Sequence, residues 1–576
     1  MALGLTPTQP GLMSSTAGFC EGRLAPNSIY VVLHRECRRL FPDTLFADLF
    51  AVNGRWSVPP MIVAVVMVLQ RLEGLSDREA VDRFTFDTRW KYAAGGLDFD
   101  HPGFVHTVLV DFRARLAASD RPGRIFDTVV EVAREAGLIG RKRVLDSTPI
   151  YDAVATQDTV TLVRSAIRQL LRAADHVLRA ELRAVLSSGD AYTDIGKPVI
   201  DWTDRGEREA LVDSRARDGY ALLAVLDGRD LPVEVAHAAA LLATVLGQDL
   251  DADAGGVFRI ARRVAKDRVI STVDPEARHG HKTSARGFDG YKGHIAADPD
   301  SEIITAAEVS AGNQGDAQTA ADLITDLLPD TDTPAEPEQA QAAQAEPEQA
   351  APEQAEAGQA EPEQAAPEQA QAGQAEAGQA GQGGDQGRPA VYGDAAYGAG
   401  EFLERLDDAD IEAKVKTQPP TNAGGRFTKD TFDIDLENDT VTCPNGVTAP
   451  IRRDRSGDGT ASFGTACARC PLATQCTTAK SGRKVTVSRH ERLLARARAD
   501  NTDPGRRADY RATRPKIERK LAHLMRHRHG GRQARMRGRT KIAADFSLLA
   551  AAVNLARLSV LAIRSTRAGT WTVAAR

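Results

Sequence analysis

Hydrophobic positions between residues 28 and 140 recur at helical spacing, with polar residues between them. Met61 to Leu69 is an unbroken apolar run, which predicts a buried helix. Ser76 and Glu79 then have the spacing of a capping box, so a further helix starts there. We expect a helical N-terminal domain over 28–140, after a disordered segment at 1–27. The pattern fits a helix-turn-helix-like DNA-binding unit and a plain helical bundle equally well.

The pattern changes to short strands after residue 140. Val144 and Leu145 lead into Asp146 and then into small polar residues and a proline, which predicts a strand that ends at the aspartate. Apolar residues at helical spacing return over residues 158–266 and predict a set of helices. The same reasoning predicts strands at Tyr291–Ala297 and Ile303–Val309, a helix at Asp316–Leu328, a strand at Val391–Gly393 that ends in Asp394, and a helix at Glu401–Asp407.

Residues 333–388 differ from both of their flanks. They repeat EPEQA and AGQA units and contain no aliphatic side chain larger than alanine. Such a segment cannot bury enough apolar surface to offset its ordering entropy, so we expect a disordered linker in a surface loop. Beyond it, residues 426–490 are polar and carry cysteines, which predicts at most short strands, and residues 510–563 are predicted to be helical.

Composition narrows the class of protein. A length of 576 residues suggests two to four domains. The run from Met61 to Leu69 is about half of what a bilayer requires, so we expect no membrane partner. The N-terminus lacks the basic and long apolar regions of a secretory signal. Six cysteines in this length exclude a disulfide scaffold.

The net charge hides two opposite regions. The formal charge is -6, but residues 335–387 hold ten Glu, one Asp and no Lys or Arg, which leaves the rest of the chain at +5. Residues 505–541 hold fourteen Lys or Arg against two acids, a local balance of +12. A basic segment of this strength predicts contact with a polyanion.

Three carboxylates are the candidate chemical groups. Asp146 and Asp394 each follow a predicted strand, and open sheets place their sites at such strand ends. Glu518 is the only acid between Tyr510 and Arg539. Three carboxylates can hold hard divalent cations, and two such ions would support an in-line phosphoryl transfer. The alternative for each acid taken singly is a helix cap or a salt bridge.

These segments resemble bacterial insertion-sequence transposases of the DDE class, in the group with a four-cysteine insert before the catalytic glutamate. The resemblance runs from about residue 40 to residue 561 outside the linker. The matching segments are Val144–Thr148, Asp289–His294, Val391–Tyr397, Tyr510–Arg519 and Ala551–Leu558.

The resemblance implies a fold and an activity. The implied fold class is an α/β ribonuclease-H-like catalytic domain with Asp146 on its first strand, Asp394 on its fourth and Glu518 on the following helix. We therefore expect this domain to be assembled from residues 141–332, with an all-helical insertion at about 158–266, residues 389–425, and residues 491–576 with the catalytic helix and a basic C-terminal region. The implied reaction is cleavage of element ends and joining of 3′-hydroxyls to target DNA, with Mg²⁺ or Mn²⁺, as two ions, held by the three acids.

The chain departs from the family in one motif. Many related transposases carry Tyr-x2-Arg-x3-Glu-x6-Lys. Here Tyr510 and Arg514 are one residue further apart, the spacing from Arg514 to Glu518 is kept, and Met525 occupies the lysine position. Glu518 is supported by this match, whereas Arg526 is only the nearest substitute for the lysine.

Four cysteines give a second metal signal. Cys443, Cys467, Cys470 and Cys476 include one CxxC pair in a polar segment, which favours a structural Zn²⁺ with four thiolate ligands over residues 426–490. The alternative is four unmetallated thiols. Cys20 and Cys37 read as plain thiols.

Basic and aromatic residues give a candidate DNA-binding set. Phosphate contacts would provide strong, salt-sensitive affinity with little sequence information. The alternative is a solvated arginine face. The residues of this set are Lys292, His294, Tyr510, Arg514, Arg526, Arg532, Arg535, Arg537 and Lys541.

We therefore interpret the sequence as a DNA transposase that acts on double-stranded DNA as a homo-oligomer in the bacterial cytoplasm, associated with the nucleoid. Two alternatives share much of the evidence. One is an inactive DNA-binding relic or repressor, and the other is a metal-dependent nuclease that cuts without strand transfer.

Overall fold

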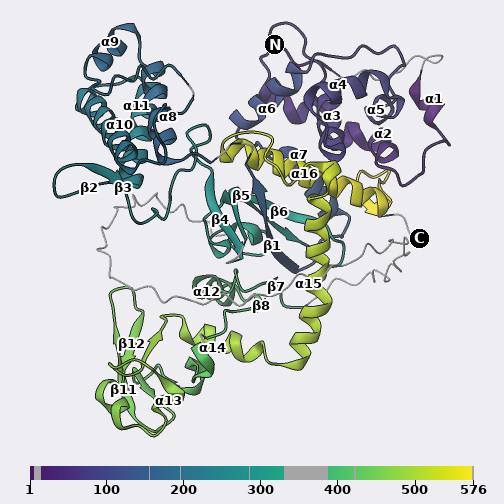
Figure 1. The fold of residues 1–576 in the computed structure, drawn as a ribbon. Coiled ribbons are helices and arrows are strands. Elements are labelled where there is room, and N and C mark those ends of the chain that lie inside the picture. Colours follow the sequence, from purple (N-terminus) through teal and green to yellow (C-terminus); the bar gives the residue numbers. More distant parts are fainter. Residues whose placement is uncertain are drawn as a thin grey trace.

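The computed structural model describes residues 1–573 except 6–14, 153, 155, 195, 284–285, 330–386 and 421–422. Figure 1 shows a central sheet with helical regions on one side and a small β-rich region on the other. The predicted linker at 333–388 lies outside the described residues, apart from its last two positions.

The central sheet carries the segments around both aspartates. Its strand order is β4-β5-β1-β7-β8, and β6 pairs with β5. β1 is parallel to β7, and β7 to β8, whereas β5 is antiparallel to its neighbours. This topology is consistent with a ribonuclease-H-like fold. The bounds are β1 (Lys142–Tyr151), β4 (Arg278–Thr283), β5 (Arg286–Ala297), β6 (Ile304–Ala311), β7 (Ala390–Gly393) and β8 (Glu412–Val415).

The N-terminal region is helical, as its pattern predicts. Ser76 and Glu79 form the predicted capping box. The run from Met61 to Leu69 is buried in α3, whose whole surface is enclosed by neighbouring helices. The helices are α2 (Ile29–Leu40), α3 (Pro60–Glu73), α4 (Asp77–Phe86), α5 (Thr88–Ala93), α6 (Thr107–Ala118) and α7 (Arg124–Glu135), with a 3-10 helix at Asp43–Leu49.

The predicted disorder of residues 1–27 is wrong for the part that the structure describes. α1 (Thr16–Cys20) is a short helix capped by the Ser15 side chain. Ala2 forms β-bridges to Ala51 and Trp56. These residues are ordered by contacts with later parts of the chain, which local composition does not encode.

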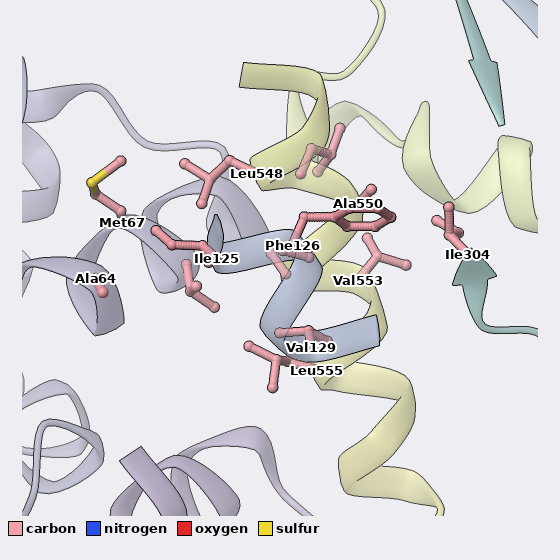
Figure 2. Packing of buried hydrophobic residues seen from close by; sticks show 14 of the residues in the cluster. Ala64, Met67, Ile125, Phe126, Val129, Ile304, Leu548, Ala550, Val553 and Leu555 are labelled. Atoms are coloured by element: carbon pink, nitrogen blue, oxygen red, sulfur yellow. The ribbon is translucent and has the colours of Figure 1, made fainter. Parts of the chain in front are cut away.

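Two C-terminal helices join the sheet to the N-terminal helices. α15 (Pro504–Leu524) lies against β1 and β7, and α16 (Arg539–Val560) packs between β6 and the helices α3 and α7. Figure 2 shows this core, where Leu555 of α16 lies next to Val129 of α7. α16 is long and apolar enough to cross a membrane, but it is 67% buried, as a core helix is. The chain ends with the hairpin β14 (Ile563–Ser565) and β15 (Trp571–Val573).

Residues 159–260 form a helical unit with a hydrophobic core of its own (Figure 1). The expectation of an all-helical insertion is wrong in one respect, because a short antiparallel hairpin follows the last helix. Asp253 at its turn accepts backbone hydrogen bonds from Gly255 and Val257, which stabilises the hairpin. The elements are α8 (Thr159–Ala173), α9 (His176–Ala184), α10 (Arg205–Leu226), α11 (Val233–Asp249), β2 (Leu250–Ala252) and β3 (Phe258–Ile260).

The cysteine-bearing segment forms a five-stranded antiparallel sheet with a small apolar core. Its strands are short, as predicted: β9 (Asp433–Asp435), β10 (Thr440–Thr442), β11 (Thr448–Arg453), β12 (Gly459–Ser462) and β13 (Lys484–Val487). A short helix, α13 (Ala473–Cys476), lies between β12 and β13. α14 (Glu491–Asp500) follows β13 and packs against β8 of the central sheet and against α12 (Gly400–Asp408), the helix that links β7 to β8.

The predicted helix at Asp316–Leu328 is wrong. The segment contains only two 3-10 turns, at Asp316–Gln318 and Asp322–Ile324. The Asp316 side chain is bound by Lys292 and Ser147, and Leu323 and Ile324 are buried against the sheet. Tertiary contacts at both turns therefore override the helical pattern.

Candidate active site

Asp146 and Asp394 lie side by side on neighbouring parallel strands. β1 does not end at Asp146 as predicted but continues to Tyr151, because β5 pairs with it over that whole stretch. β7 is shorter and ends at Gly393, after pairing Tyr392 with Val144. Continuing this register places Asp394, the first residue beyond β7, level with Asp146.

Arg514 of α15 lies between the two aspartates. One of its guanidinium nitrogens is 2.9 Å from Asp146 Oδ1 and 3.7 Å from Asp394 Oδ2. The other donates a hydrogen bond of 3.2 Å to the Leu145 carbonyl. The Arg514 side chain is only 9% exposed, so it is not available as the DNA contact that the sequence analysis expected. The two carboxylates therefore face a single positive charge.

The surroundings of Asp394 raise the pKa of its carboxyl group. Burial raises the pKa of Asp394, and the nearby charges of Asp146 and Asp316 raise it further. The Ala396 amide, which donates to Asp394 at 3.0 Å, and Arg514 act in the opposite direction. Because neighbouring carboxylates disfavour each other's ionised form, a cation bound between them would stabilise that form.

Glu518 lies one helical turn after Arg514 on α15. Its side chain is exposed, and no hydrogen bond or ion pair of this carboxylate is found among the described residues. Within the described ranges, no three His, Cys, Asp or Glu side chains come close enough together to hold a metal ion. The structure thus brings Asp146 and Asp394 together but does not complete a three-carboxylate site with Glu518.

The helix that carries Glu518 begins earlier than its sequence suggests. The helical stretch was predicted from residue 510, but α15 starts at Pro504, with Asp503 as its N-cap, and Pro515 lies inside it. Tyr510 anchors this helix to the end of β7, because its hydroxyl donates to the Gly393 carbonyl at 3.2 Å. Tyr510 is half-buried and thus positions α15 beside Asp394.

Asp316 is a fourth acid near the pair that the sequence analysis missed. Its carboxylate accepts a hydrogen bond from Ser147 Oγ at 2.6 Å and is 2.8 Å from Lys292 Nζ. Ser147 directly follows Asp146, so this group adjoins the candidate site. The sequence offers no comparable signal, since Asp316 lies seven residues beyond the predicted strand Ile303–Val309, whereas Asp394 directly follows its strand.

Lys292 and His294, two of the predicted DNA-binding residues, are largely enclosed by the protein. His294 is fully buried between Tyr397 and Ser310, with its Nε2 atom 2.8 Å from the Ser310 hydroxyl. Burial lowers the pKa of His294 to about 4, so its ring is neutral at pH 7. Lys292 is mostly buried and bonds to Asp316 and to the Gln314 carbonyl. Both residues stabilise the sheet beside Ser147.

The basic segment after α15 has the opposite character. We define it as residues 526–541. Its five predicted DNA-binding residues are exposed, and none of them forms an ion pair with an acid in the described part of the chain: Arg526, Arg532, Arg535, Arg537 and Lys541. Arg535 donates to the Leu75 carbonyl, and its charge lowers the pKa of Asp77 and Glu79. The segment is fixed to the end of β1, five residues beyond Asp146, because the Tyr151 amide donates to the Arg532 carbonyl at 2.8 Å.

The four cysteines of the predicted zinc site share the small β-rich region. Burial raises the pKa of Cys476, and charge on Cys467, Cys443 and Cys470 raises it further, so the four thiols are neighbours. They are nevertheless not assembled as metal ligands in the described chain. The structure therefore gives no support for zinc. Cys20 and Cys37 are buried free thiols.

Three family models match separate parts of this chain. A transposase DDE domain matches residues 442–559, which include Glu518 and the basic segment. A second transposase DDE domain matches residues 252–336, which include β4 to β6. A transposase domain of the DUF772 type matches residues 24–115 in the N-terminal helices. No curated protein and no solved structure matches the chain. In these three segments the chain is similar to transposases of the DDE class, and the paired aspartates of the central sheet agree with that similarity.

Proposed function

We propose that this protein is a transposase, which cuts the ends of its element and joins the resulting 3′-hydroxyls to target DNA by metal-dependent phosphoryl transfer. Asp146, Asp394 and Glu518 are the proposed catalytic residues. The observation that carries the proposal is the pair of strand-borne aspartates facing one cationic group, Arg514. Such a pair is a ready binding position for positive charge at the edge of a sheet.

The residues present fit divalent metal ions in their chemistry. Carboxylate oxygens are the ligands that Mg²⁺ and Mn²⁺ prefer, and Asp146 and Asp394 offer them on adjacent strands. Glu518 is the proposed third ligand, on the support of the family motif and of its place one turn from Arg514. Two bound ions would activate the attacking oxygen and stabilise the leaving oxygen.

The protein's own residues would hold the DNA and keep the acids in place. Tyr510 and Arg514 fix α15 against β7 and β1, which sets the position of Glu518. The exposed cations of the basic segment would neutralise phosphates on DNA that passes the end of β1. Because their contacts are with phosphates, the affinity should fall steeply with salt.

The test is incubation of the purified protein with labelled DNA from the element ends and a target plasmid, with Mg²⁺ or EDTA. Metal-dependent end cleavage with joined products, absent in Asp146→Asn and Asp394→Asn, would support the proposal. Cleavage without joining would make the protein a nuclease. Binding without cleavage under Mg²⁺ and Mn²⁺ would make it a DNA-binding relic.

A structural zinc ion in the cysteine region is a separate proposal, and it rests on the CxxC spacing of the sequence alone. Elemental analysis of the purified protein should find one zinc per chain, and Cys470→Ser should release it whereas Cys20→Ser should not. A zinc content of zero would leave four plain thiols.

We also propose that the enzyme acts as a homo-oligomer, because two element ends must be held together during joining. Light scattering of the protein with and without end DNA gives the number of chains. A single chain in the active DNA complex would contradict this proposal.

A further inference from the structure

A hollow of about 720 Å³ lies beside the candidate active site. One wall is the segment 264–270, which returns from the helical unit to the sheet, and the other is formed by β4, β5 and the loop 312–315 after β6. Pockets that enclose one small molecule have volumes of a few hundred to about 1,000 Å³, so this hollow can admit a single nucleotide but not a duplex.

The lining of this hollow is predominantly basic. Arg268 and Arg278 are paired with Asp249 and Asp267, so their charges are largely compensated. Lys266 and His281 line the same space, and the described part of the chain provides no acidic partner for either. The hollow thus presents uncompensated positive charge, as an anion-binding site does.

The ring pair His279 and His281 adds a flat surface to the basic lining. The two rings lie edge to face with their centroids 4.8 Å apart. Asp289 holds His279 in this position, at 2.7 Å from its Nδ1 atom. A fixed ring beside free positive charge suits a ligand that carries both a base and a phosphate.

Close backbone packing keeps the hollow open. A Cβ atom on Gly280 would lie 2.1 Å from the Gly312 carbonyl oxygen, so only glycine permits β4 and the loop 312–315 to pack this closely within their shared wall. Gly315 lines the same space, but a Cβ atom on it would meet nothing within 4 Å. A larger side chain at Gly315 would therefore extend into the hollow without disturbing its walls.

The hollow is connected to the catalytic aspartates through a short chain of contacts. Lys292 lines it and binds Asp316, which in turn accepts the hydrogen bond of Ser147, the residue after Asp146. Lys282 on β4 also reaches the Ser147 carbonyl, at 3.5 Å. A DNA strand held at Asp146 would need to extend by only a short distance to enter it.

We propose that this hollow binds one unpaired nucleotide of the DNA strand that continues past the scissile phosphate. This inference rests on the proposed function, since it presumes that DNA is cut at Asp146 and Asp394. Size excludes paired bases, and the uncompensated charge of Lys266 favours the phosphate. The strand could belong to the element end or to the target, and the chemistry of recognition is the same for both.

The test compares binding of a short blunt duplex with binding of the same duplex carrying a single-stranded extension of a few nucleotides, on the 3′ or the 5′ strand. Fluorescence anisotropy in Ca²⁺ gives the affinities without cleavage. We expect wild type to prefer one extended duplex on the order of tenfold, the range that stacking of a base provides. Gly315→Leu should remove the preference and leave the blunt affinity unchanged, whereas Gly247→Leu, on an exposed face of α11, should change neither.

Lys266→Gln is a second variant, which removes a positive charge from the hollow instead of filling the hollow with a larger side chain. It should reduce the preference several-fold and leave the melting temperature unchanged, because Lys266 is exposed. Photocrosslinking from 5-iododeoxyuridine in the extension should reach peptides of 264–281, and repeating it with the label in element-end or target DNA identifies the source strand.

Equal affinity of wild type for blunt and extended DNA would overturn the inference, as would a preference that persists in both variants. Neither result bears on cleavage, so the proposed function would stand. If wild type shows the preference but never cuts DNA, the proposed function fails and the nucleotide site remains.

Discussion

Arg514 and Arg537 belong to one strongly basic stretch of sequence, yet the structure gives them opposite surroundings. Arg514 is buried between Asp146 and Asp394, so its positive charge is paired with carboxylates of the protein itself. Arg537 is exposed, and no acid of the described chain pairs with it. Lys520 resembles Arg514, since its side chain is only 6% exposed. A count of basic residues therefore overestimates the surface available to DNA, and burial decides which cations can bind phosphate.

The largest expected effect separates catalysis from DNA binding. Glu518→Gln should reduce end cleavage on the order of 1,000-fold, because a neutral amide is a poor substitute for a carboxylate at a metal site. DNA affinity should be unchanged or slightly higher, since one negative charge is removed. Gel-based cleavage assays and anisotropy measure the two quantities. Glu437→Gln, an exposed acid in the cysteine region, is the matched control. Normal cleavage by Glu518→Gln would remove this residue from the mechanism.

The second prediction concerns the buried cation. Arg514→Gln leaves two neighbouring carboxylates without their shared positive charge, and breaking a buried ion pair destabilises a protein by about 4 kcal/mol. The melting temperature should therefore fall in metal-free buffer, and added Mg²⁺ should raise it more than in wild type, because ligand binding to the folded state stabilises it. Arg511→Gln, exposed on the same helix, is the control. An equal Mg²⁺ shift in all three proteins would contradict a cation site at Asp146 and Asp394.

The third prediction uses the pH dependence of Lys520. Burial lowers the pKa of this lysine from 10.5 to about 8, and the positive charges of Arg557 and Arg519 act in the same direction, against the raising effect of Glu302. Between pH 8 and 10.5 the unfolded chain binds more protons here than the folded one, so stability contributed by this group rises with pH. Relative to Lys520→Met, wild type should gain up to about 3 kcal/mol across that window. Chemical denaturation at several pH values measures the difference, and parallel curves for both proteins would show that Lys520 is not buried as described.

The candidate site shows how far the sequence alone could lead. Apolar residues before Asp146 and Asp394 predict strands because that pattern is local, and both aspartates were found in this way. Glu518 was found only through the family motif. The contact of Arg514 with the Leu145 carbonyl joins residues 369 positions apart, and that of Asp316 with Ser147 joins residues 169 apart. No periodicity encodes such contacts, so the burial of Arg514 and the presence of Asp316 had to come from the fold.

The smallest expected effect concerns the exposed arginines of the basic segment and their contribution to DNA binding. Arg537→Gln should weaken DNA binding a few-fold and reduce the slope of log affinity against log salt by about 0.9, because one phosphate contact is lost. Arg205→Gln is the control, since Arg205 is already paired with Glu209 on α10. Salt titrations by anisotropy give both slopes. An unchanged slope for Arg537→Gln would assign this residue to a merely solvated surface.

The central claim is that Asp146 and Asp394 bind the catalytic metal directly, and a change of metal preference tests it most directly. A thiolate is a soft ligand that binds Mg²⁺ poorly and accepts Mn²⁺ more readily. Asp394→Cys should therefore lose end cleavage in Mg²⁺ and recover part of it in Mn²⁺, while wild type remains active in Mg²⁺. A variant that is equally active in both metals, or equally inactive in both while still binding DNA, would contradict direct ligation by Asp394.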